Sequence, residues 1–487
     1  MKNIIHVPNG SRYEENGWVR INVRGSPSQR GLAYGQLIRD LLPKIVKAIS
    51  FVMVDDYGVD IQTMKNLIYD VYSPIVAANY PELMSEIEAI AKGVNSSEAD
   101  LKFMFFWNCY YSFSYIFGKL PGIIASDPRL SSKYGDVFPG DVKSGAAEGG
   151  AGDKCSAFLA VGDWTADGKI VCGHNTFDNF IDSQWVNVML CVKPDKGNSF
   201  IMQCAPGQVA SGTDYYVTSN GFIVTETTIG GFNQFKLANP VFCRIRHAVQ
   251  HGRSLDDYVR HLKDGNGGDY SNSWLIGDTR GNEIMRIELG LKYVNVERKK
   301  NGYFIGFNAP YDGRIRNLEC SNTGFNDIRR HQGARKVRLE QLMEQHKGKI
   351  TVEIGQEILG DHYDVYLNKI NPCSRTCCSH YDLDQREYMS QASRPLPYQP
   401  RGAMDGIVSS TALANRMGLS ARWGSSCGLP FYAKEFFERN IQWKQQEPYI
   451  LDRPHQPWTV FTCAKRDGVK TGKNRRSKGR GTRKTKA

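Results

Sequence analysis

The feature that most constrains the fold is a change of sequence pattern at Cys155. Downstream of it, short segments rich in Val, Ile, Phe and Tyr alternate with Gly, Asp and Asn, as in "SAFLAVG", "KIVCGHN" and "GFIVTETTI". Such segments are typical of antiparallel strands joined by tight turns. Upstream of it, apolar residues recur with a helical period, for example in "PELMSEIEAIAKGV" at 81–94. The chain is therefore expected to begin with helices and to continue as a sheet-rich body.

The order of the later segments predicts the fold class. Helical patterns interrupt the strands at 239–264 and 334–348, and a loop-rich stretch follows at about 361–460. Strands and helices that alternate in blocks, with hairpin-like spacing, indicate an α+β fold of packed antiparallel sheets flanked by helices. We divide the chain into a helical N-terminal segment, a Gly-rich linker or processing loop, a core and a basic tail, at 1–120, 121–154, 155–464 and 465–487 respectively.

The positive charge of the chain is concentrated in the tail. Residues 465–487 hold eleven of the 62 Lys and Arg residues and one of the 50 Asp and Glu residues, so the remainder is nearly neutral. The tail lacks apolar periodicity, and we expect it to be disordered. It is either a contact for an anionic partner such as nucleic acid or a solvated terminus.

The remaining composition is typical of a soluble globular protein. No run of about 18 apolar residues predicts a transmembrane segment, and the first residues contain no apolar stretch that would predict a secretory signal. Twelve cysteines without such a signal favour reduced thiols over a disulfide framework. Several of them, Cys172, Cys191 and Cys204, lie in apolar segments where a thiol acts as a small hydrophobic group.

One group of residues raises the question of a metal site. The stretch "CSRTCCSH" contains Cys373, Cys377, Cys378 and His380. Its spacing is not a paired C-x-x-C, and no second ligand pair follows at a usual distance. We therefore interpret it as a loop with buried thiols, with metal binding as the alternative, and expect no metal and no cofactor.

The position of Cys155 itself permits a particular chemistry. The stretch "KSGAAEGGAGDK" at 143–154 precedes the cysteine directly, and such a sequence can bend back on the residue that follows it. If the bond before Cys155 were cut, one residue would carry both a thiol and an α-amino group whose pKa is about 7.7–8.0. That amine can act as general base for the thiol. A loop followed by an ordinary buried thiol is the alternative.

Several segments, in this order, resemble the cysteine N-terminal-nucleophile hydrolases, and within them the phospholipase B-like and penicillin acyltransferase-like branch. The resemblance covers roughly residues 15–460 and rests on "RGLAYGQLI" at 30–38, "CSAF" at 155–158, "GHNTFDNF" at 173–180, "SGTDYYVTSNGFIVTETTI" at 211–229, "GDYSNSWLIGD" at 268–278 and "YFIGFN" at 303–308. It implies a four-layer αββα sandwich, self-cleavage before the cysteine, and hydrolysis of an amide or ester through a thioester. We expect the two fragments to remain associated, because the aromatic stretch at 105–113 has no other place to be buried.

The resemblance also implies roles for individual residues. Cys155 is expected to be the nucleophile and new N-terminus, and His174 a pocket group beside it. Phe177 stands where the phospholipase B-like branch has Trp, so the ring is retained but its N–H donor is lost. The other expected site residues are Thr228 as oxyanion donor, Asn272, Asn308 as the group that polarises the acyl carbonyl, and Arg335, with Arg338 as its alternative. Each also has an ordinary interpretation, as a core histidine, a strand or turn residue, or a solvated helix residue.

We therefore expect a self-processing hydrolase that acts on a small acyl substrate, either a phospholipid or an N-acyl compound. The same fold used as an acyltransferase is one alternative, which a product assay with and without an added amine distinguishes. The other alternative is a nucleic-acid-associated protein with an inactive body, for which binding would depend on salt and on residues 465–487. The absent signal favours a cytoplasmic protein or a soluble bacterial or viral form in a reducing compartment, and export by a different route is the alternative.

Overall fold

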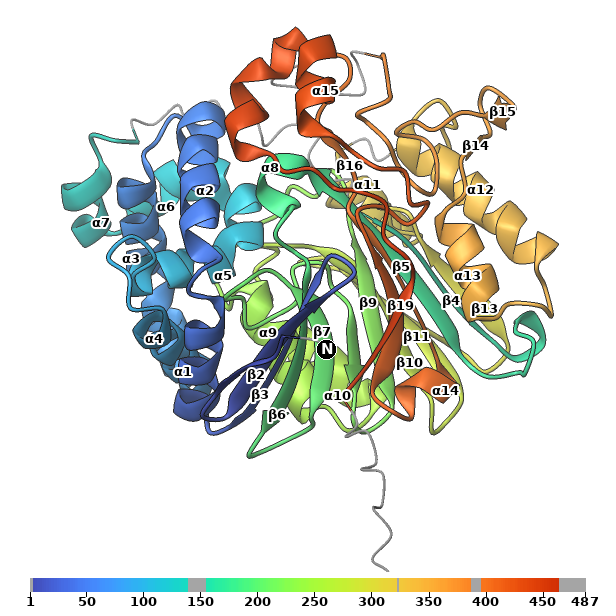
Figure 1. Ribbon diagram of the computed structural model, residues 1–487, viewed down its shortest axis with the longest axis horizontal. Coiled ribbons are helices and arrows are strands. Elements are labelled where there is room, and N and C mark those ends of the chain that lie inside the picture. Colours follow the sequence, from blue (N-terminus) through green and yellow to red (C-terminus); the bar gives the residue numbers. More distant parts are fainter. Residues whose placement is uncertain (1–2, 139–154, 322–323, 387–395, 464–487) are drawn as a thin grey trace, which may run out of the picture.

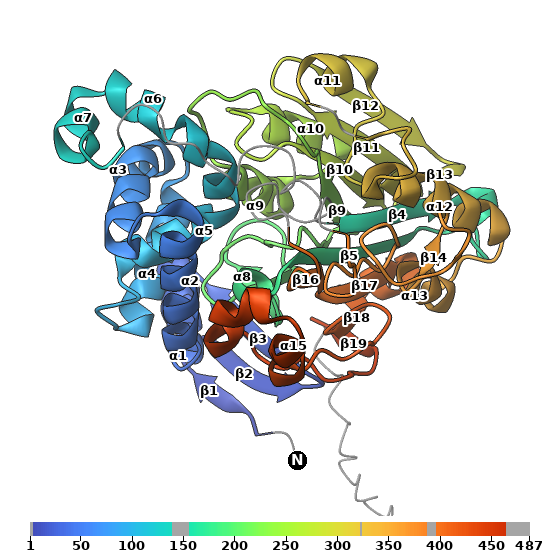
Figure 2. The same cartoon turned by 90° about the horizontal axis from the view of Figure 1, so that it is seen from above.

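Two β-sheets packed face to face form the centre of the molecule (Figure 1). The structure is a computed structural model that describes residues 3–138, 155–321, 324–386 and 396–463. Strand β4 (Cys155–Val161) of one sheet contacts β9 (Phe222–Thr228) of the other. Helices cover the outer faces of both sheets (Figure 2). The predicted four-layer αββα arrangement is therefore confirmed.

The larger sheet contains ten strands. Its neighbours pair antiparallel except β3 and β6, which pair parallel with Val19 opposite Val188. The first three strands come from residues that were predicted to be helical, and they extend the sheet at one edge (blue in Figure 1). In sheet order, the strands are β1 (Ile5–Val7), β2 (Gly10–Glu15), β3 (Trp18–Gly25), β6 (Val188–Pro194), β7 (Phe200–Cys204), β8 (Tyr216–Thr218), β9, β10 (Asn272–Asp278), β11 (Glu283–Leu289) and β12 (Val294–Lys299).

The smaller sheet has seven strands and carries Cys155. Its order is β13 (Gly302–Gly306), β4, β5 (Val171–Asn179), β17 (Asp405–Ser410), β18 (Gly418–Trp423) and β19 (Thr459–Thr462), with β16 (Arg401–Ala403) paired to the end of β5. Three of these strands lie within the stretch that was predicted to be loop-rich. A separate two-stranded sheet joins β14 (Tyr363–Asp364) and β15 (Lys369–Ile370).

The N-terminal helices pack beside the larger sheet. Helix α4 has the bounds predicted from its periodicity, and Pro43 begins a new helix, α2. The glycines of "RGLAYGQLI" allow α1 to approach α4, because a Cβ atom at Gly35 would lie 2.2 Å from the Ile90 carbonyl oxygen. These helices are α1 (Pro27–Ile38), α2 (Leu42–Tyr57), α3 (Ile61–Asn79), α4 (Pro81–Val94), α5 (Leu101–Ile116), α6 (Leu120–Ser126) and α7 (Pro128–Tyr134).

The remaining helices complete the two outer layers. Helices α9 and α10 cover the larger sheet, and α12 and α13 cover the smaller one. Helices α9, α10 and α12 occupy the regions in which the sequence predicted them. The elements are α8 (Phe180–Ser183), α9 (Val241–His251), α10 (Leu255–Lys263), α11 (Gly313–Leu318), α12 (His331–Gln345), α13 (Val352–Leu359), α14 (Thr411–Ala414) and α15 (Ala433–Arg439), with 3-10 helices at Phe117–Lys119, Gly162–Trp164 and Ile441–Tyr449.

Alternation along β4 creates two hydrophobic cores. Ala157 and Leu159 face the other sheet and join the main core, whereas Phe158 and Ala160 face α12 and α13 and join a second core. Every side chain of β4 is buried, which explains why its sequence has no polar face. Cys155 lies at the start of this doubly buried strand.

The linker prediction for 121–154 is wrong in its first part. Helices α6 and α7 occupy most of residues 120–134, because Pro121 and Pro128 lie in first helical turns and Asp127 caps α7. Residues 139–154 and the predicted tail lie outside the described residues. None of the helices in the described part of the chain is long and apolar enough to cross a bilayer.

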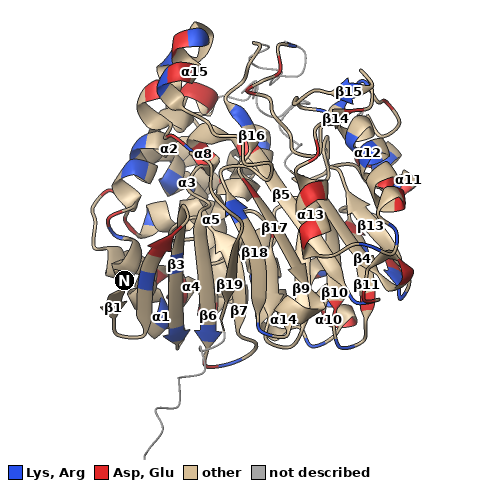
Figure 3. Cartoon of the chain, turned by 45° about the vertical axis from the view of Figure 1, so that its right-hand side comes forward, with Lys and Arg blue, Asp and Glu red and all other residues tan. Residues whose placement is uncertain are grey.

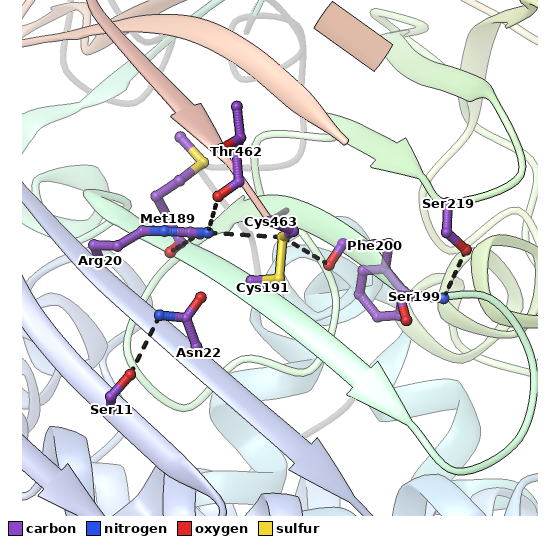
Figure 4. The surroundings of a disulfide bond; sticks show 10 residues. All are labelled: Ser11, Arg20, Asn22, Met189, Cys191, Ser199, Phe200, Ser219, Thr462 and Cys463. Atoms are coloured by element: carbon purple, nitrogen blue, oxygen red, sulfur yellow. Dashed lines mark hydrogen bonds between the residues drawn. A yellow bond between two sulfur atoms is a disulfide. The ribbon is translucent and has the colours of Figure 1, made fainter. Parts of the chain in front are cut away.

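One disulfide bond contradicts the expectation that the cysteines are reduced. Cys191 of β6 is bonded to Cys463, which follows β19, and the bond therefore joins the two sheets (Figure 4). The Arg20 side chain contacts the same place, since it donates to the Thr462 carbonyl oxygen at 2.9 Å. The two cysteines are 272 residues apart in sequence, so only the stacking of the sheets brings them together.

Charged residues lie mainly on the helices and at the ends of the strands (Figure 3). Lys and Arg are interspersed with Asp and Glu over the described surface, as a nearly neutral body requires. The strands of the smaller sheet carry few charged residues, whereas β2, β11 and β12 of the larger sheet carry several.

Candidate active site

Cys155 lies at the first position of β4, and its side chain is buried, with 2% of the residue exposed. Its backbone N–H donates to Oδ1 of Asn308 at 3.2 Å. It is paired across the sheet with Thr176 of β5. Cys155 therefore lies at a strand end, and its backbone nitrogen atom is held by the side-chain amide of Asn308.

His174 shares a face of the smaller sheet with Cys155. It pairs with Ala157, and residues at alternate positions of a strand point to the same side, so both side chains lie between the two sheets. His174 is completely buried, and this burial lowers its pKa to about 3. The imidazole is neutral near pH 7 and is a weak base.

Asn308 follows β13 and connects both sheets. Its Oδ1 accepts from the Cys155 N–H and from Nη2 of Arg335 at 2.9 Å, while its Nδ2 donates to the Thr228 carbonyl oxygen at 2.8 Å. Its φ of 67° lies in the left-handed region, which Asn adopts more readily than most residues. The turn after β13 thus aims the amide at the strand end that carries Cys155.

Arg335 is buried, although it lies on a charged helix. Its Nη1 donates to the carbonyl oxygen of Cys155, and its guanidinium group stacks 4.8 Å from the centre of the Phe177 ring. Phe177 thus supplies an aromatic face at the position where the sequence suggested that a Trp donor was lost. The alternative, Arg338, forms an ion pair with Asp361 at 2.7 Å instead, with no described contact to Cys155.

Thr228 and Asn272 lie opposite each other on β9 and β10. The Thr228 hydroxyl donates to the Tyr270 hydroxyl at 2.7 Å, and Tyr270 in turn donates to Oε1 of Glu226 at 3.3 Å. With its amide oriented to satisfy its neighbours, Asn272 donates to Oε2 of Glu226 at 3.1 Å. Asn272 and Thr228 therefore belong to one buried network centred on a carboxylate.

The sequence did not indicate Glu226 or Tyr270 as site residues. Glu226 lies in the "TETT" segment and is completely buried. The signal that could have revealed Glu226 is an acidic residue in a strand otherwise made of Phe, Ile, Val and Thr.

The surroundings of Cys155 keep its thiol protonated in the chain as described. Burial raises its pKa well above the usual value, and the carboxylates of Glu226 and Asp214 act in the same direction. A hydrogen bond with the Thr228 backbone and the charge of Arg335 oppose this effect but are weaker. The thiolate therefore requires a base close to the sulfur.

A narrow pocket opens beside this network. Tyr270, whose hydroxyl contacts Thr228, forms one of its walls, and Asp214 forms another part. The lining is otherwise mainly apolar or aromatic on its helical side, where it includes Tyr111, Val241, Phe242 and Ile245. Asn108, Gln208 and Ser211 add polar groups to the lining, which does not include Cys155.

The residues of "CSRTCCSH" separate into two groups. The Cys373 thiol donates to Asp364 at 3.5 Å, and Cys377 packs into the second hydrophobic core. Cys378 and His380 converge instead with two residues that the sequence did not single out, His362 and Cys427. Their ligand atoms all lie within 4.8 Å of one another, and could hold a metal ion.

Comparison with known proteins gives several phospholipase B-like relatives. The family model described as "Phospholipase B" matches residues 126–287. "Putative phospholipase B-like 2" of Rattus norvegicus is 22% identical over 381 residues, covering 68% of this chain and 63% of that protein. "Phospholipase B" of Crotalus adamanteus is 25% identical over 276 residues, covering 51% and 47% respectively.

The resemblance to the phospholipase B-like proteins is confirmed. The chain spans less than two thirds of the length of these two phospholipase B-like relatives. Among solved structures, a mutant conjugated bile acid hydrolase of Clostridium perfringens is 11% identical, with a TM-score of 0.31 over 55% of this chain and 89% of that one.

Proposed function

We propose that this phospholipase B-like protein is a self-processing cysteine hydrolase that cleaves an amide or ester acyl bond through a thioester on Cys155. The observation that carries the proposal is the pair of contacts on the backbone of Cys155. Asn308 accepts from its nitrogen atom, and Arg335 donates to its carbonyl oxygen. These two contacts would hold the N-terminal residue of a cut chain in place.

Self-cleavage begins when the thiol of Cys155 attacks the carbonyl carbon of Lys154, which lies outside the described residues. The C–N bond breaks, the nitrogen atom takes a proton and becomes the α-amine of Cys155, and a thioester forms. Water then hydrolyses this thioester, which releases the carboxylate of Lys154 and restores the thiol. The strong burial of Cys155 makes an external base difficult to bring in, and this favours the α-amine as the base of the mature enzyme.

In turnover, the α-amine takes the thiol proton while the sulfur attacks the acyl carbonyl of the substrate. We assign Asn308 two tasks. Its Oδ1, which accepts from the Cys155 nitrogen atom, orients the α-amine. Its Nδ2, which donates to the Thr228 carbonyl oxygen in this structure, turns to polarise the acyl carbonyl of the substrate. Thr228 and Asn272 stabilise the buried Glu226 network: Thr228 donates to Tyr270, and Asn272 donates to Glu226. His174, being neutral, would act as a wall of the site rather than as the base.

The substrate proposed is a lipid or another N-acyl or O-acyl compound. The support is the similarity of the chain to the phospholipase B-like relatives. The fragments 1–154 and 155–487 should remain associated, because the aromatic side chains of α5, such as Phe105 and Phe113, are buried in the main core.

Mass spectrometry and N-terminal sequencing of the active protein test the proposal. We expect two fragments with a free α-amine on Cys155, and an acyl adduct on this residue during turnover. Cys155→Ala should remain one uncut, inactive chain, and Cys155→Ser should cut slowly, since a hydroxyl is a weaker nucleophile than a thiolate. Full activity of protein in which Lys154 is still joined to Cys155 would exclude the amine mechanism.

A further inference from the structure

Four metal-ligand side chains meet where three loop segments approach one another. His362 follows α13, Cys378 and His380 follow β15, and Cys427 follows β18. Nε2 of His380 lies 3.4 Å from the sulfur atom of Cys378 and 3.4 Å from that of Cys427. The ring of His362 lies against that of His380, with 5.2 Å between ring centres.

These separations match those of a tetrahedral zinc site. With Zn–S bonds of about 2.3 Å and Zn–N bonds of about 2.0 Å, adjacent sulfur and nitrogen ligands lie about 3.5 Å apart. The two measured sulfur–nitrogen distances agree with this value, and the widest spacing in the cluster is 4.8 Å or less. Binding would therefore require a contraction of only about 1 Å across the widest pair.

The second layer of contacts orients the ligand atoms inward. Nδ1 of His380 lies 3.3 Å from Oδ1 of Asp382, and a carboxylate on one ring nitrogen directs the other nitrogen toward a metal. The sulfur atom of Cys427 accepts from the backbone N–H of Leu429 at 3.4 Å, and the Ser425 hydroxyl lies at the same distance. Such contacts stabilise a thiolate ligand.

One ring nitrogen of the cluster has no hydrogen-bond partner outside the cluster among the described residues. Nε2 of His362 is buried without one, although buried nitrogen atoms are normally paired. Cys378 and His380 are buried as well. A bound cation supplies a partner for all four side chains at once, which a hydrogen bond between any two of them does not.

We propose that His362, Cys378, His380 and Cys427 bind a structural Zn²⁺ ion. Two thiolates and two imidazoles are the ligand set that zinc prefers in closed tetrahedral sites. Because the protein supplies all four ligands, no position remains for water or substrate, and the ion does no chemistry. This inference is independent of the reaction proposed for Cys155.

The ion would stabilise the surroundings of the nucleophile by joining two loops. The side-chain nitrogen of Asn175 donates to the Cys377 carbonyl oxygen at 2.9 Å and to the Ser426 hydroxyl at 3.1 Å. Its Oδ1 accepts from the Ser156 N–H at 3.0 Å. Each loop that carries a cysteine ligand thus contacts Asn175, which contacts the residue next to Cys155.

The test is the metal content of the full chain purified under reducing conditions with zinc in the growth medium. Plasma mass spectrometry should find about one zinc per chain. Cys427→Ser and His362→Ala should each lose most of this zinc, whereas the control Cys373→Ser should keep it, because that thiol faces Asp364. A strong chelator should lower the Tm of wild type more than that of Cys427→Ser.

A second readout decides the matter if the ligand variants do not fold. Cobalt exchanged into the wild-type chain should show the intense visible bands of a tetrahedral site and a thiolate charge-transfer band. Wild-type protein that holds no zinc and gives no such bands would overturn the proposal. A disulfide between Cys378 and Cys427, found by peptide mapping of this protein, would do so too, as would zinc that persists in both ligand variants.

Discussion

Replacement of Asn308 tests how the site is held together, because this side chain makes three contacts that can be weighed. The two neutral hydrogen bonds, with the Cys155 N–H and the Thr228 carbonyl, contribute about 1 kcal/mol each, and the one from Arg335 about 2 kcal/mol. Alanine at a φ of 67° costs about 1 kcal/mol more. We expect Asn308→Ala to lower the free energy of unfolding by about 5 kcal/mol.

The assay is urea denaturation in a Cys155→Ala background, so that self-cleavage does not contribute. Asn308→Gly should lose about 1 kcal/mol less than Asn308→Ala, because glycine accepts the left-handed conformation. Asn308→Asp keeps the acceptor for Arg335 and for the Cys155 N–H but loses the donor to Thr228, so it should be the least destabilised of the three.

Activity of the same variants in the Cys155 background separates the stabilising role from the catalytic one. Loss of one oxyanion donor lowers turnover about 100- to 1000-fold. We expect this loss in Asn308→Asp, which remains folded at the assay temperature. Two results would contradict this reasoning. One is a free energy of unfolding for Asn308→Ala within about 1 kcal/mol of that of the Cys155→Ala background. The other is a wild-type rate of turnover for Asn308→Asp.

Three further predictions concern other parts of the chain. Deletion of residues 465–487 should leave Tm and hydrolysis unchanged, since that segment has few apolar residues to bury; a Tm shift of several degrees would contradict this. Burial raises the pKa of Asp405 to about 7, from its ordinary value of 3.8. Between about pH 4 and 7 the folded chain therefore keeps a proton on Asp405 that the unfolded chain releases, so the free energy of unfolding should fall as the pH rises through this range. Asp405→Asn should flatten this dependence in denaturation curves recorded across that range, and an unchanged slope would refute it. Cys191→Ala should lower the free energy of unfolding by about 2–5 kcal/mol under oxidising but not reducing conditions, because the bond to Cys463 closes a long loop; equal stability in both conditions would mean that the bond is absent.

The elements that sequence predicted well are those whose pattern is local. Helix α4 has its predicted bounds because its apolar residues repeat on one face and Pro81 begins its first turn. The prediction failed where local signals were weak. Residues 120–134 carry Gly, Ser and Pro yet form α6 and α7, and the stretch after 400 supplies β17 and β18, whose strand character comes from their neighbours in the sheet.

The candidate site depended on both kinds of information. The resemblance directed attention to Asn308 and to Arg335, with Arg338 as the alternative, but it could not show what either arginine contacts. The choice follows from the direction in which α12 meets β4, which buries Arg335 against Cys155 and leaves Arg338 to pair with Asp361. Glu226 and Tyr270 were missed because their importance lies in contacts across strands.

By itself, the sequence determined the alternation of helical and strand segments and the placement of a cysteine at the start of a strand. These depend on residues close together in the chain, whose periodicity is set by backbone geometry. Only the tertiary structure decided that Cys191 meets Cys463, and that His362 and Cys427 join Cys378 and His380. The members of each set are far apart in the sequence. Their contact therefore depends on how the sheets and helices pack, and no local pattern along the chain predicts it.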